Sequence, residues 1–208
     1  MDFWKIEREF NVKGYSCICG VDEAGRGPLA GPVYTAAVIL PFGIEIAKLN
    51  DSKKLPEKVR ESLYDEIICN AESYAVAFAN HDEVDKYNIL NATFLAMNRA
   101  IAGLSVEPDI CLIDGNRSSG ITYNNETVTG GDGLSASIAA ASILAKVNRD
   151  RFMIKAAEKY PHYAFEKHKG YGTKLHYERL RKYGPCEIHR ISFLQRWLKE
   201  DIGYESER

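Results

Sequence analysis

The sequence predicts an α/β domain with a mixed sheet flanked by helices, followed by a helical C-terminal appendage. Short apolar runs typical of β-strands alternate with segments in which apolar residues recur at helical spacing. Beyond residue 159 the chain becomes basic and aromatic, and it is interrupted by prolines and several glycines. We therefore expect residues 1–160 to form the main domain and residues 161–208 to form an appendage packed on it.

Length and composition agree with this fold class. A chain of 208 residues, 45% hydrophobic and 27% charged, has the size and balance of one globular domain. This composition excludes disordered, collagen-like and fibrous proteins. No run approaches the ~18 apolar residues of a membrane span, and the N-terminus lacks the apolar core of a secretory signal. Five cysteines without a repeating spacing predict neither a disulfide framework nor a zinc site, so we expect a cytoplasmic protein.

Two strands are expected near the N-terminus, at residues 15–21 (YSCICGV) and 32–40 (PVYTAAVIL). The connection between them, DEAGRGPLAG, contains three glycines and a proline, which is typical of a tight turn between strands. It is not a phosphate-binding loop of the Walker type, because no Gly-Lys-Ser/Thr follows and Pro28 would interrupt the helix such a loop requires.

The middle of the chain is expected to hold two helices and two strands. Apolar residues recur at helical spacing in residues 56–72, where Pro56 suits the first helical turn. Asn88 is expected to cap a second helix that runs to residue 102. The strands are expected at residues 74–79 (YAVAFA) and 110–113 (ICLI), and the second of them ends on Asp114.

A long helix is expected over residues 135–160. It begins SASIAAASILAKV and is apolar nearly all round, which predicts a central, buried position. After it we expect a loop and then one or two amphipathic helices. The segment from Lys146 to Lys199 has 14 basic residues against 5 acidic ones, whereas the rest of the chain is acidic. A polyanionic partner would fit that asymmetry, although basic helices are often simply solvated.

Four acidic residues stand out by position. Asp22 and Glu23 follow the first expected strand, Asp114 ends a buried one, and Asp132 precedes the central helix in a Gly-Gly-Asp-Gly sequence. Strand ends and helix starts along one sheet edge bring distant residues together. Carboxylates gathered there repel one another unless divalent cations neutralise them, and an all-oxygen ligand set favours Mg²⁺ or Mn²⁺ over zinc.

Each of these residues also has a simpler explanation. Asp132 could be a helix cap, Asp114 part of a turn, and Asp22 and Glu23 ordinary loop charges. Likewise, Gly25-Arg26-Gly27 offers backbone N–H donors beside a guanidinium, but it could be only a strand connection. Spacing alone leaves these alternatives open.

Several motifs, in order, give this chain a specific resemblance to the ribonuclease HII family. The resemblance covers residues 15–195, and the motifs that carry it are GVDEAGRGPLAGPV at 20–33, LNDSKKL at 49–55, LIDGN at 112–116, GGDGLSASIAAASILAKVNRDR at 130–151, HKGYGT at 168–173 and YGPCEIHRISF at 183–193. It implies an RNase H-like fold with a mixed five-stranded sheet. It also implies nicking of duplex DNA on the 5′ side of embedded ribonucleotides and cleavage of RNA–DNA hybrids.

The resemblance also implies roles for particular residues. Asp22, Glu23, Asp114 and Asp132 would be the catalytic, metal-binding quartet, holding two Mg²⁺ or Mn²⁺ ions. Gly25, Arg26 and Gly27 would contact the ribose 2′-OH, the group that distinguishes RNA from DNA. Tyr171 would stack on the sugar of the next deoxynucleotide.

Basic residues supply candidate phosphate contacts, although any one of them could be a solvated surface charge. Asp150 could support the site, but an ion pair within its helix is the stronger expectation. Three histidines in the basic region are expected to pack rather than catalyse. The candidate phosphate contacts are Lys53 and Lys146, then Lys54, Arg149 and Lys169; the histidines are His168, His176 and His189.

The chain departs from the family pattern at three places where basic residues are common, namely Gly130, Leu134 and Ile191. These departures affect the expected substrate affinity more than the quartet. Arg26 and the short N-terminal lead argue against the related ribonuclease HIII. We expect a monomer that acts on RNA–DNA hybrids and ribonucleotide-containing DNA, without a sliding-clamp peptide after residue 196. Two rivals stay open: a nuclease specific for hybrids, and a catalytically silent hybrid-binding module.

Overall fold

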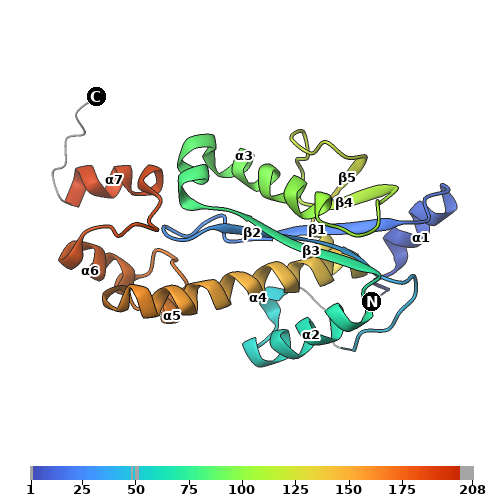
Figure 1. Ribbon diagram of the computed structural model, residues 1–208, viewed down its shortest axis with the longest axis horizontal. Coiled ribbons are helices and arrows are strands. Elements are labelled where there is room, and N and C mark those ends of the chain that lie inside the picture. Colours follow the sequence, from blue (N-terminus) through green and yellow to red (C-terminus); the bar gives the residue numbers. More distant parts are fainter. Residues whose placement is uncertain (1, 48, 50–51, 202–208) are drawn as a thin grey trace.

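The computed structural model describes residues 2–47, 49 and 52–201. Figure 1 shows the arrangement of its helices and strands. The helices are α1 (Lys5–Val12), α2 (Glu57–Asn70), α3 (His81–Ala102), α4 (Ala136–Lys159), α5 (Phe165–His168), α6 (Lys174–Tyr183) and α7 (Ile191–Asp201), with 3₁₀ turns η1 (Ser52–Lys54), η2 (Gly131–Gly133) and η3 (Pro161–Tyr163). The strands are β1 (Ile18–Ala24), β2 (Val33–Ile39), β3 (Ser73–Ala79), β4 (Ile110–Asp114) and β5 (Asn125–Val128).

The five strands form one mixed sheet in the order β3-β2-β1-β4-β5. β1 pairs antiparallel with β2, and β2 antiparallel with β3, whereas β1 with β4 and β4 with β5 are parallel. The expected fold class, a mixed five-stranded sheet flanked by helices, is therefore confirmed. The parallel pairing places Val21 opposite Ile113. The next residues along the two strands, Asp22 and Asp114, consequently end up as neighbours.

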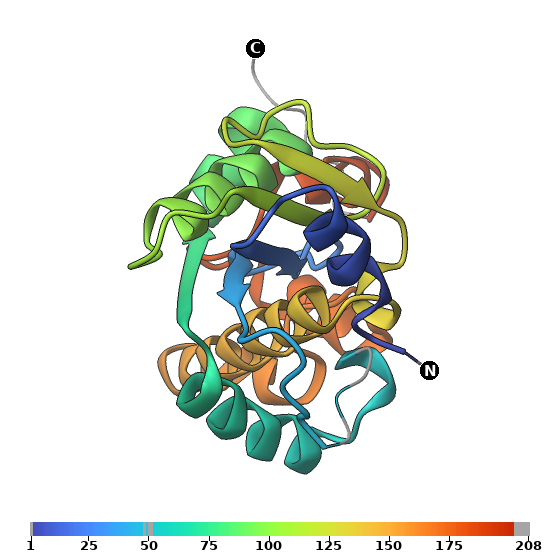
Figure 2. The same ribbon diagram turned by 90° about the vertical axis from the view of Figure 1, so that its right-hand side faces the viewer.

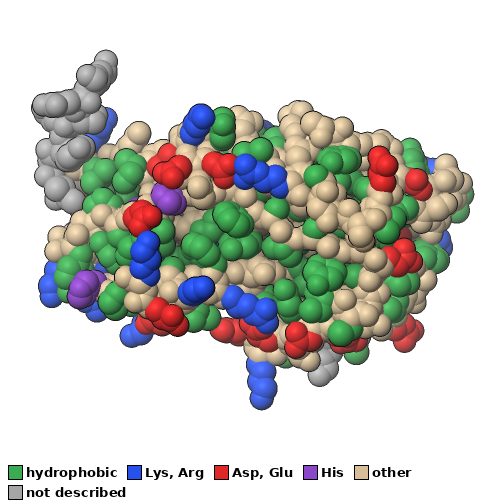
Figure 3. Space-filling view, viewed as in Figure 1, with side chains coloured by type: hydrophobic (Ala, Val, Ile, Leu, Met, Phe, Trp, Pro, Cys, Tyr) green, Lys and Arg blue, Asp and Glu red, His purple; other side chains and the backbone are tan. Residues whose placement is uncertain are grey.

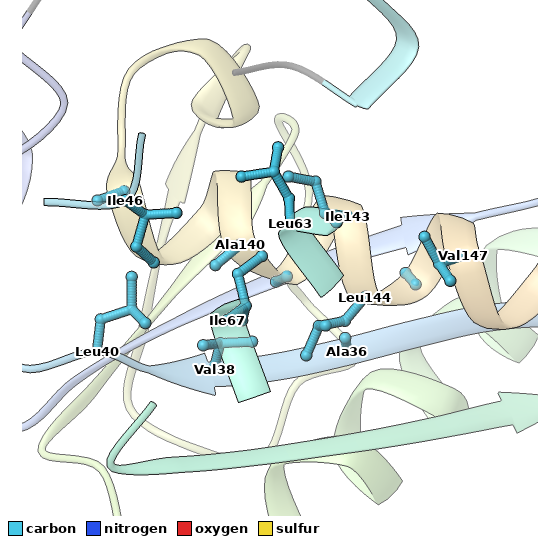
Figure 4. Packing of buried hydrophobic residues seen from close by; sticks show 13 residues of the cluster. Ala36, Val38, Leu40, Ile46, Leu63, Ile67, Ala140, Ile143, Leu144 and Val147 are labelled. Carbon is cyan, nitrogen blue, oxygen red and sulfur yellow. The ribbon is translucent and has the colours of Figure 1, made fainter. Parts of the chain in front are cut away.

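Helices cover both faces of the sheet: α3 lies on one side, and α4 and α2 lie on the other (Figures 1 and 2). Because side chains alternate along β2, this strand contributes to the hydrophobic clusters on both faces of the sheet. Ala36 and Val38 pack in the cluster formed with α2 and α4, which Figure 4 shows from close by. Ala37 and Ile39 pack in the cluster formed with α3.

The long helix α4 is the central element, as its composition predicts. Ser135 caps it, with the side-chain oxygen accepting a hydrogen bond from the backbone N–H of Ile138. The helix approaches β1 very closely at Gly20. A Cβ atom on Gly20 would lie 2.1 Å from the carbonyl carbon of Ser137, so only glycine permits this packing.

Several expected boundaries are wrong. β1 begins and ends about three residues later than predicted, so Asp22 and Glu23 lie inside the strand instead of after it. α3 begins at His81, not at Asn88. Asn88 is a kink with φ 64°, and its side-chain oxygen still accepts hydrogen bonds from the N–H groups of Leu90 and Asn91. Residue-level reasoning also missed α1 and β5.

The residues after α4 form a helical appendage, with three helices where one or two were expected. η3, α5, α6 and α7 contribute to one hydrophobic cluster with the C-terminal half of α4. Phe165, Leu180 and Leu194 from the appendage are buried there with Met153 of α4. The proposed division into residues 1–160 and 161–208 stays a prediction. Residues 202–208 lie outside the described part of the chain, and within that part no helix is long and apolar enough to cross a membrane.

We predict that Gly20→Ala lowers the free energy of unfolding by about 3 kcal/mol, because the added methyl group meets the α4 backbone, which cannot move aside as a flexible side chain can. Urea denaturation followed by circular dichroism measures this change. Gly133→Ala is the matched control, since no atom lies within 4 Å of its added methyl group. Equal stability of the two variants would contradict the close packing of β1 on α4.

Candidate active site

Three aspartates from distant parts of the sequence meet at one end of the sheet. Asp22 lies on β1, Asp114 ends β4, and Asp132 lies in η2 just before α4. One carboxylate oxygen from each lies within 4.8 Å of the other two. The structure therefore brings together three of the four acidic residues that the sequence singles out.

Local backbone geometry orients these side chains. Asp114 Oδ1 accepts a hydrogen bond of 2.7 Å from the N–H of Gly131, which ties the end of β4 to η2. Asp22 Oδ1 accepts a 2.7 Å hydrogen bond from the N–H of Glu23. Asp22 points toward the α4 side of the sheet, where the Ser142 hydroxyl also interacts with it. The site is therefore assembled from the C-terminal part of β1, the end of β4 and the turn that precedes α4.

Glu23 is not part of the three-aspartate cluster. Successive residues of a strand point to opposite faces, so Glu23 projects toward α3 instead of α4. There it lines a cavity of about 390 Å³ together with Arg26, Asp114, Arg117 and apolar residues of α3. Its Oε1 lies 3.6 Å from Nη1 of Arg26. Asp22 and Glu23, although adjacent in the sequence, therefore point to opposite faces of the sheet.

Burial and mutual repulsion make the carboxylates costly to ionise. Burial raises the pKa of Asp22 well above its ordinary value, and the charges of Glu23 and Asp114 add to the shift. Burial likewise raises the pKa of Asp114, with a further increase from Asp132 and an opposing effect of the Gly131 N–H. Burial also raises the pKa of Glu23, although Arg26 opposes the shift.

This donor set fits a divalent cation. Asp22, Asp114 and Asp132 offer only carboxylate oxygens, which are the ligands that Mg²⁺ and Mn²⁺ prefer. A bound cation would also offset the repulsion that raises the pKa values of Asp22 and Asp114. The three aspartates can therefore hold a divalent metal ion.

The glycine loop, defined here as residues 25–31, lies beside Tyr171. A methyl group placed on Gly27 would lie 3.9 Å from Cε1 of Tyr171, and the Tyr171 side chain is 43% exposed. Arg26 is exposed as well. Two segments that are about 145 residues apart in the sequence thus form one accessible surface next to the carboxylates, which the motifs alone do not reveal.

The basic residues have mixed surroundings. Lys53 Nζ lies 3.2 Å from Asp132 Oδ2, so it belongs to the carboxylate cluster. Lys146 Nζ pairs with Asp150 at 2.7 Å, and this pair is the helix ion pair that we expected for Asp150. Both lysines stay predicted phosphate contacts. The prediction that Arg149 contacts phosphate is wrong. Arg149 lies inside α4 and is fully buried, and its guanidinium donates hydrogen bonds to backbone carbonyls.

The sequence reasoning missed Arg190 entirely. This arginine is fully buried and donates four hydrogen bonds to carbonyls of the glycine loop. Its position within the motif HRISF was the available signal. The three histidines pack together as expected: His176 Nε2 lies 3.0 Å from His189 Nε2, and the His168 ring stacks on that of His176. The basic surplus forms no unbroken patch on the face in Figure 3, where Lys and Arg alternate with Asp and Glu.

Comparison with known proteins identifies the family of this fold and site. A sequence model of ribonuclease HII matches residues 19–196. The chain belongs to the ribonuclease HII family. The ribonuclease HII of Caldicellulosiruptor bescii is 54% identical to it, over 95% of this chain and 96% of its own length. A crystal structure of ribonuclease H2 from Pyrococcus horikoshii superposes with a TM-score of 0.72 at 25% identity, covering 89% of this chain and 100% of its own.

A second solved structure shows the same fold. RNase HII of Archaeoglobus fulgidus, in its complex with PCNA, superposes with a TM-score of 0.71 at 23% identity, over 85% of this chain and 94% of its own. Membership of the family makes this chain a ribonuclease H, an endonuclease that acts on RNA–DNA hybrids. Enzymes of this family depend on divalent metal ions, in agreement with the carboxylate cluster.

We predict that Asp114→Asn stabilises the metal-free protein at neutral pH, because it removes one of the repelling buried charges while keeping an oxygen that accepts from Gly131. The thermal midpoint in EDTA should rise by a few degrees. Since the folded-state pKa of Asp114 is raised, its destabilising effect is present above that pKa and disappears as the pH falls through it. The increase in thermal midpoint caused by Asp114→Asn should therefore become smaller toward acidic pH.

The same variant should lose the metal response. Mn²⁺ binding to the folded state should raise the wild-type midpoint with increasing concentration, and this rise should be largely absent in Asp114→Asn. Asp109→Asn is the control, because Asp109 precedes β4 at the end of the strand opposite to Asp114, is exposed and, among the described residues, its carboxylate accepts hydrogen bonds from the N–H groups of Ser16 and Cys17. An equal Mn²⁺ response in wild type and Asp114→Asn would contradict the proposed metal site.

Proposed function

We propose that this ribonuclease H nicks duplex DNA on the 5′ side of single embedded ribonucleotides, in addition to cutting the RNA strand of hybrids. The products would carry a 3′-OH and a 5′-phosphate. The enzyme would serve ribonucleotide excision repair and the removal of RNA primers. The observation that carries this proposal is the surface formed by Gly27 and Tyr171, whose neighbour Arg26 lines one cavity with Glu23 and Asp114.

Asp22, Asp114, Asp132 and, from the opposite face, Glu23 would hold two divalent cations, Mg²⁺ or Mn²⁺. Such ions, when bound, supply charge neutralisation at the phosphate and activation of the attacking water. Glu23 reaches the site from the α3 side, since its charge interacts with that of Asp114. Lys53, close to Asp132, would balance the negative charge and contact the substrate backbone.

The glycine loop would recognise the ribonucleotide. Within the described residues, the N–H groups of Arg26 and Gly27 donate to no protein acceptor, and both residues are exposed. Backbone donors of this kind suit a phosphate oxygen and a ribose 2′-OH. The guanidinium of Arg26 adds a cation that fits the adjacent phosphate.

Tyr171 would examine the sugar on the 3′ side of the ribonucleotide. Its half-exposed ring beside Gly27 offers a flat apolar surface on which a deoxyribose fits. A 2′-OH at that position would be crowded and would lose its water partners, which favours DNA there. The loop and the ring together would therefore read an RNA–DNA junction.

The test uses three end-labelled duplexes: DNA with one ribonucleotide, all-DNA, and an RNA–DNA hybrid, each incubated with Mg²⁺, Mn²⁺ or EDTA. We expect a metal-dependent nick on the 5′ side of the ribonucleotide and an intact all-DNA control. Cleavage of the hybrid alone would reject junction reading but keep the ribonuclease H activity. Cleavage in EDTA would reject the metal dependence.

We predict that Tyr171→Ala lowers kcat/KM about tenfold for the single-ribonucleotide duplex, since base or sugar stacking on one aromatic ring contributes about 1–3 kcal/mol. Hybrid cleavage should fall less, because a hybrid offers no RNA–DNA junction to detect. Tyr183→Ala is the control, as its ring is also partly exposed but stacks on His162. Equal losses on both substrates in Tyr171→Ala would reject the junction role.

Three further expectations stay predictions: a monomer, a cytoplasmic location and the absence of a sliding-clamp peptide. Such a peptide would be sought after residue 196, and residues 202–208 of that stretch lie outside the described residues. The PCNA complex of the Archaeoglobus fulgidus protein is a property of that protein.

A further inference from the structure

Arg190 is a buried arginine whose hydrogen bonds all go to backbone carbonyls of the glycine loop. Nη2 donates to Gly25 O at 2.7 Å, and Nη1 donates to Arg26 O and Pro28 O, both at 2.9 Å. Nε donates to Gly31 O at 2.8 Å. One side chain from the appendage therefore binds four carbonyls spread over seven residues of this loop.

The contacts of Arg190 decide which groups the loop presents to a ligand. Because these carbonyls accept from a buried guanidinium, they are turned into the protein. The N–H groups of Arg26 and Gly27, at the exposed tip, remain without an acceptor among the described residues. A loop with its acceptors fixed inward and its donors free is suited to an anion or a hydroxyl oxygen. The four side-chain hydrogen bonds of Arg190 hold the loop in this arrangement.

Arg149 connects the same loop to Tyr171. Its Nη2 donates to Ala30 O at 3.3 Å and to Lys169 O at 2.9 Å, and its guanidinium carbon lies 5.5 Å from the centre of the Tyr171 ring. A hydrogen bond of 2.9 Å from Leu29 N to Gly170 O joins the two segments directly. The glycine loop and the Tyr171 segment are thus fastened to each other.

Both arginines are charged without an ion pair among the described residues. Burial and the charge of Arg149 lower the pKa of Arg190 to about 9, which leaves it cationic at neutral pH. Asp85 attracts Arg190 electrostatically, but its carboxylate accepts from the N–H groups of Ile191 and Ser192. Burying cations in this way is costly unless they make many hydrogen bonds. The two positive charges also lie directly behind the surface proposed to receive the nucleic-acid backbone.

We propose that Arg190 is a positioning residue for substrate discrimination: it holds the glycine loop in the conformation that presents the Arg26 and Gly27 N–H groups to a single ribonucleotide, while Arg149 ties Tyr171 to the same frame. This inference rests on the proposed function. It extends that function by assigning discrimination to two buried guanidiniums that do not touch the substrate.

The experiment compares Arg190→Lys and Arg190→Met with the wild type. The measured quantity is the ratio of kcat/KM on the single-ribonucleotide duplex to kcat/KM on the hybrid. A single ribonucleotide offers the loop one 2′-OH, whereas a hybrid offers many, so a loosened loop should harm the first substrate more. We expect the ratio to fall about tenfold in Arg190→Met, the loss that one or two charge-assisted hydrogen bonds explain. Arg190→Lys keeps the charge and should fall less.

Two further measurements separate positioning from general destabilisation. Hydrogen exchange of a peptide that covers residues 25–31 should become faster in Arg190→Lys, while exchange in β4 stays unchanged. Ile67→Ala is the matched control, since Ile67 is fully buried in the cluster between α2 and α4 and does not touch the loop. It should lower the thermal midpoint and leave the substrate ratio at its wild-type value.

The outcomes are distinguishable. If the wild type cuts the single-ribonucleotide duplex no faster than the all-DNA duplex, both the proposed function and the role of Arg190 are wrong. If the wild type nicks at single ribonucleotides but both Arg190 variants retain its substrate ratio, only the proposal for Arg190 is overturned. A ratio that falls equally in Ile67→Ala would also overturn it, because the effect would then follow stability alone.

Discussion

The parallel pairing of β1 with β4 is the constraint on which the rest of the structure depends. Its register makes Asp22 and Asp114 neighbours at two strand ends, and the start of α4 brings Asp132 to the same place. Two of these three carboxylates, Asp22 and Asp132, are buried, and burial together with mutual repulsion raises the pKa values of Asp22 and Asp114. Such an arrangement costs stability in the absence of cations. Divalent ions bound here would offset that cost, which is why we propose this edge of the sheet as the site of phosphodiester chemistry.

Other features of the fold keep this edge in place. Gly20 allows α4 to lie directly on β1. The buried carboxylate of Glu7 accepts a 2.6 Å hydrogen bond from the Ser135 hydroxyl and a 3.1 Å hydrogen bond from the Ser137 N–H, so α1 holds the first turn of α4. That turn immediately follows Asp132. Arg190 and Arg149 hold the glycine loop and Tyr171 through hydrogen bonds that do not involve the carboxylates, so the carboxylates and the surface proposed to read the substrate are supported independently.

Much of this architecture could be predicted from the sequence, because it depends on periodicity and on local motifs. The length and central position of α4 follow from a segment that is apolar all round, whereas its cap is Ser135 and not Asp132, the residue that the sequence offered as a possible helix cap. The amphipathic α1 and the four-residue β5 were missed from the residues alone: β5 is short and mostly polar, and its pairing with β4 is a tertiary contact. The boundary of β1 was wrong because strand pairing with β2 extends through the charged Asp22 and Glu23.

For the site, too, the sequence predicted some features and missed others. Position in the sequence singled out the acidic residues, but only the alternation of side chains along β1 shows that Glu23 faces α3 while Asp22 faces α4. Arg149 was expected to contact phosphate, and Arg190 received no role, because a charged residue in a basic segment has no sequence signal for complete burial. Most of their side-chain hydrogen bonds join residues more than 110 positions apart, and such contacts depend on the complete fold.

The most direct test of this account is an anomalous-scattering measurement on crystals of the enzyme grown with Mn²⁺. The account predicts anomalous density bonded to carboxylate oxygens of Asp22, Asp114 and Asp132, at the end of β1 and β4. Mn²⁺ bound only elsewhere on the molecule, with these three carboxylates making no contact to it, would contradict the central claim that the parallel strand pair builds the metal site.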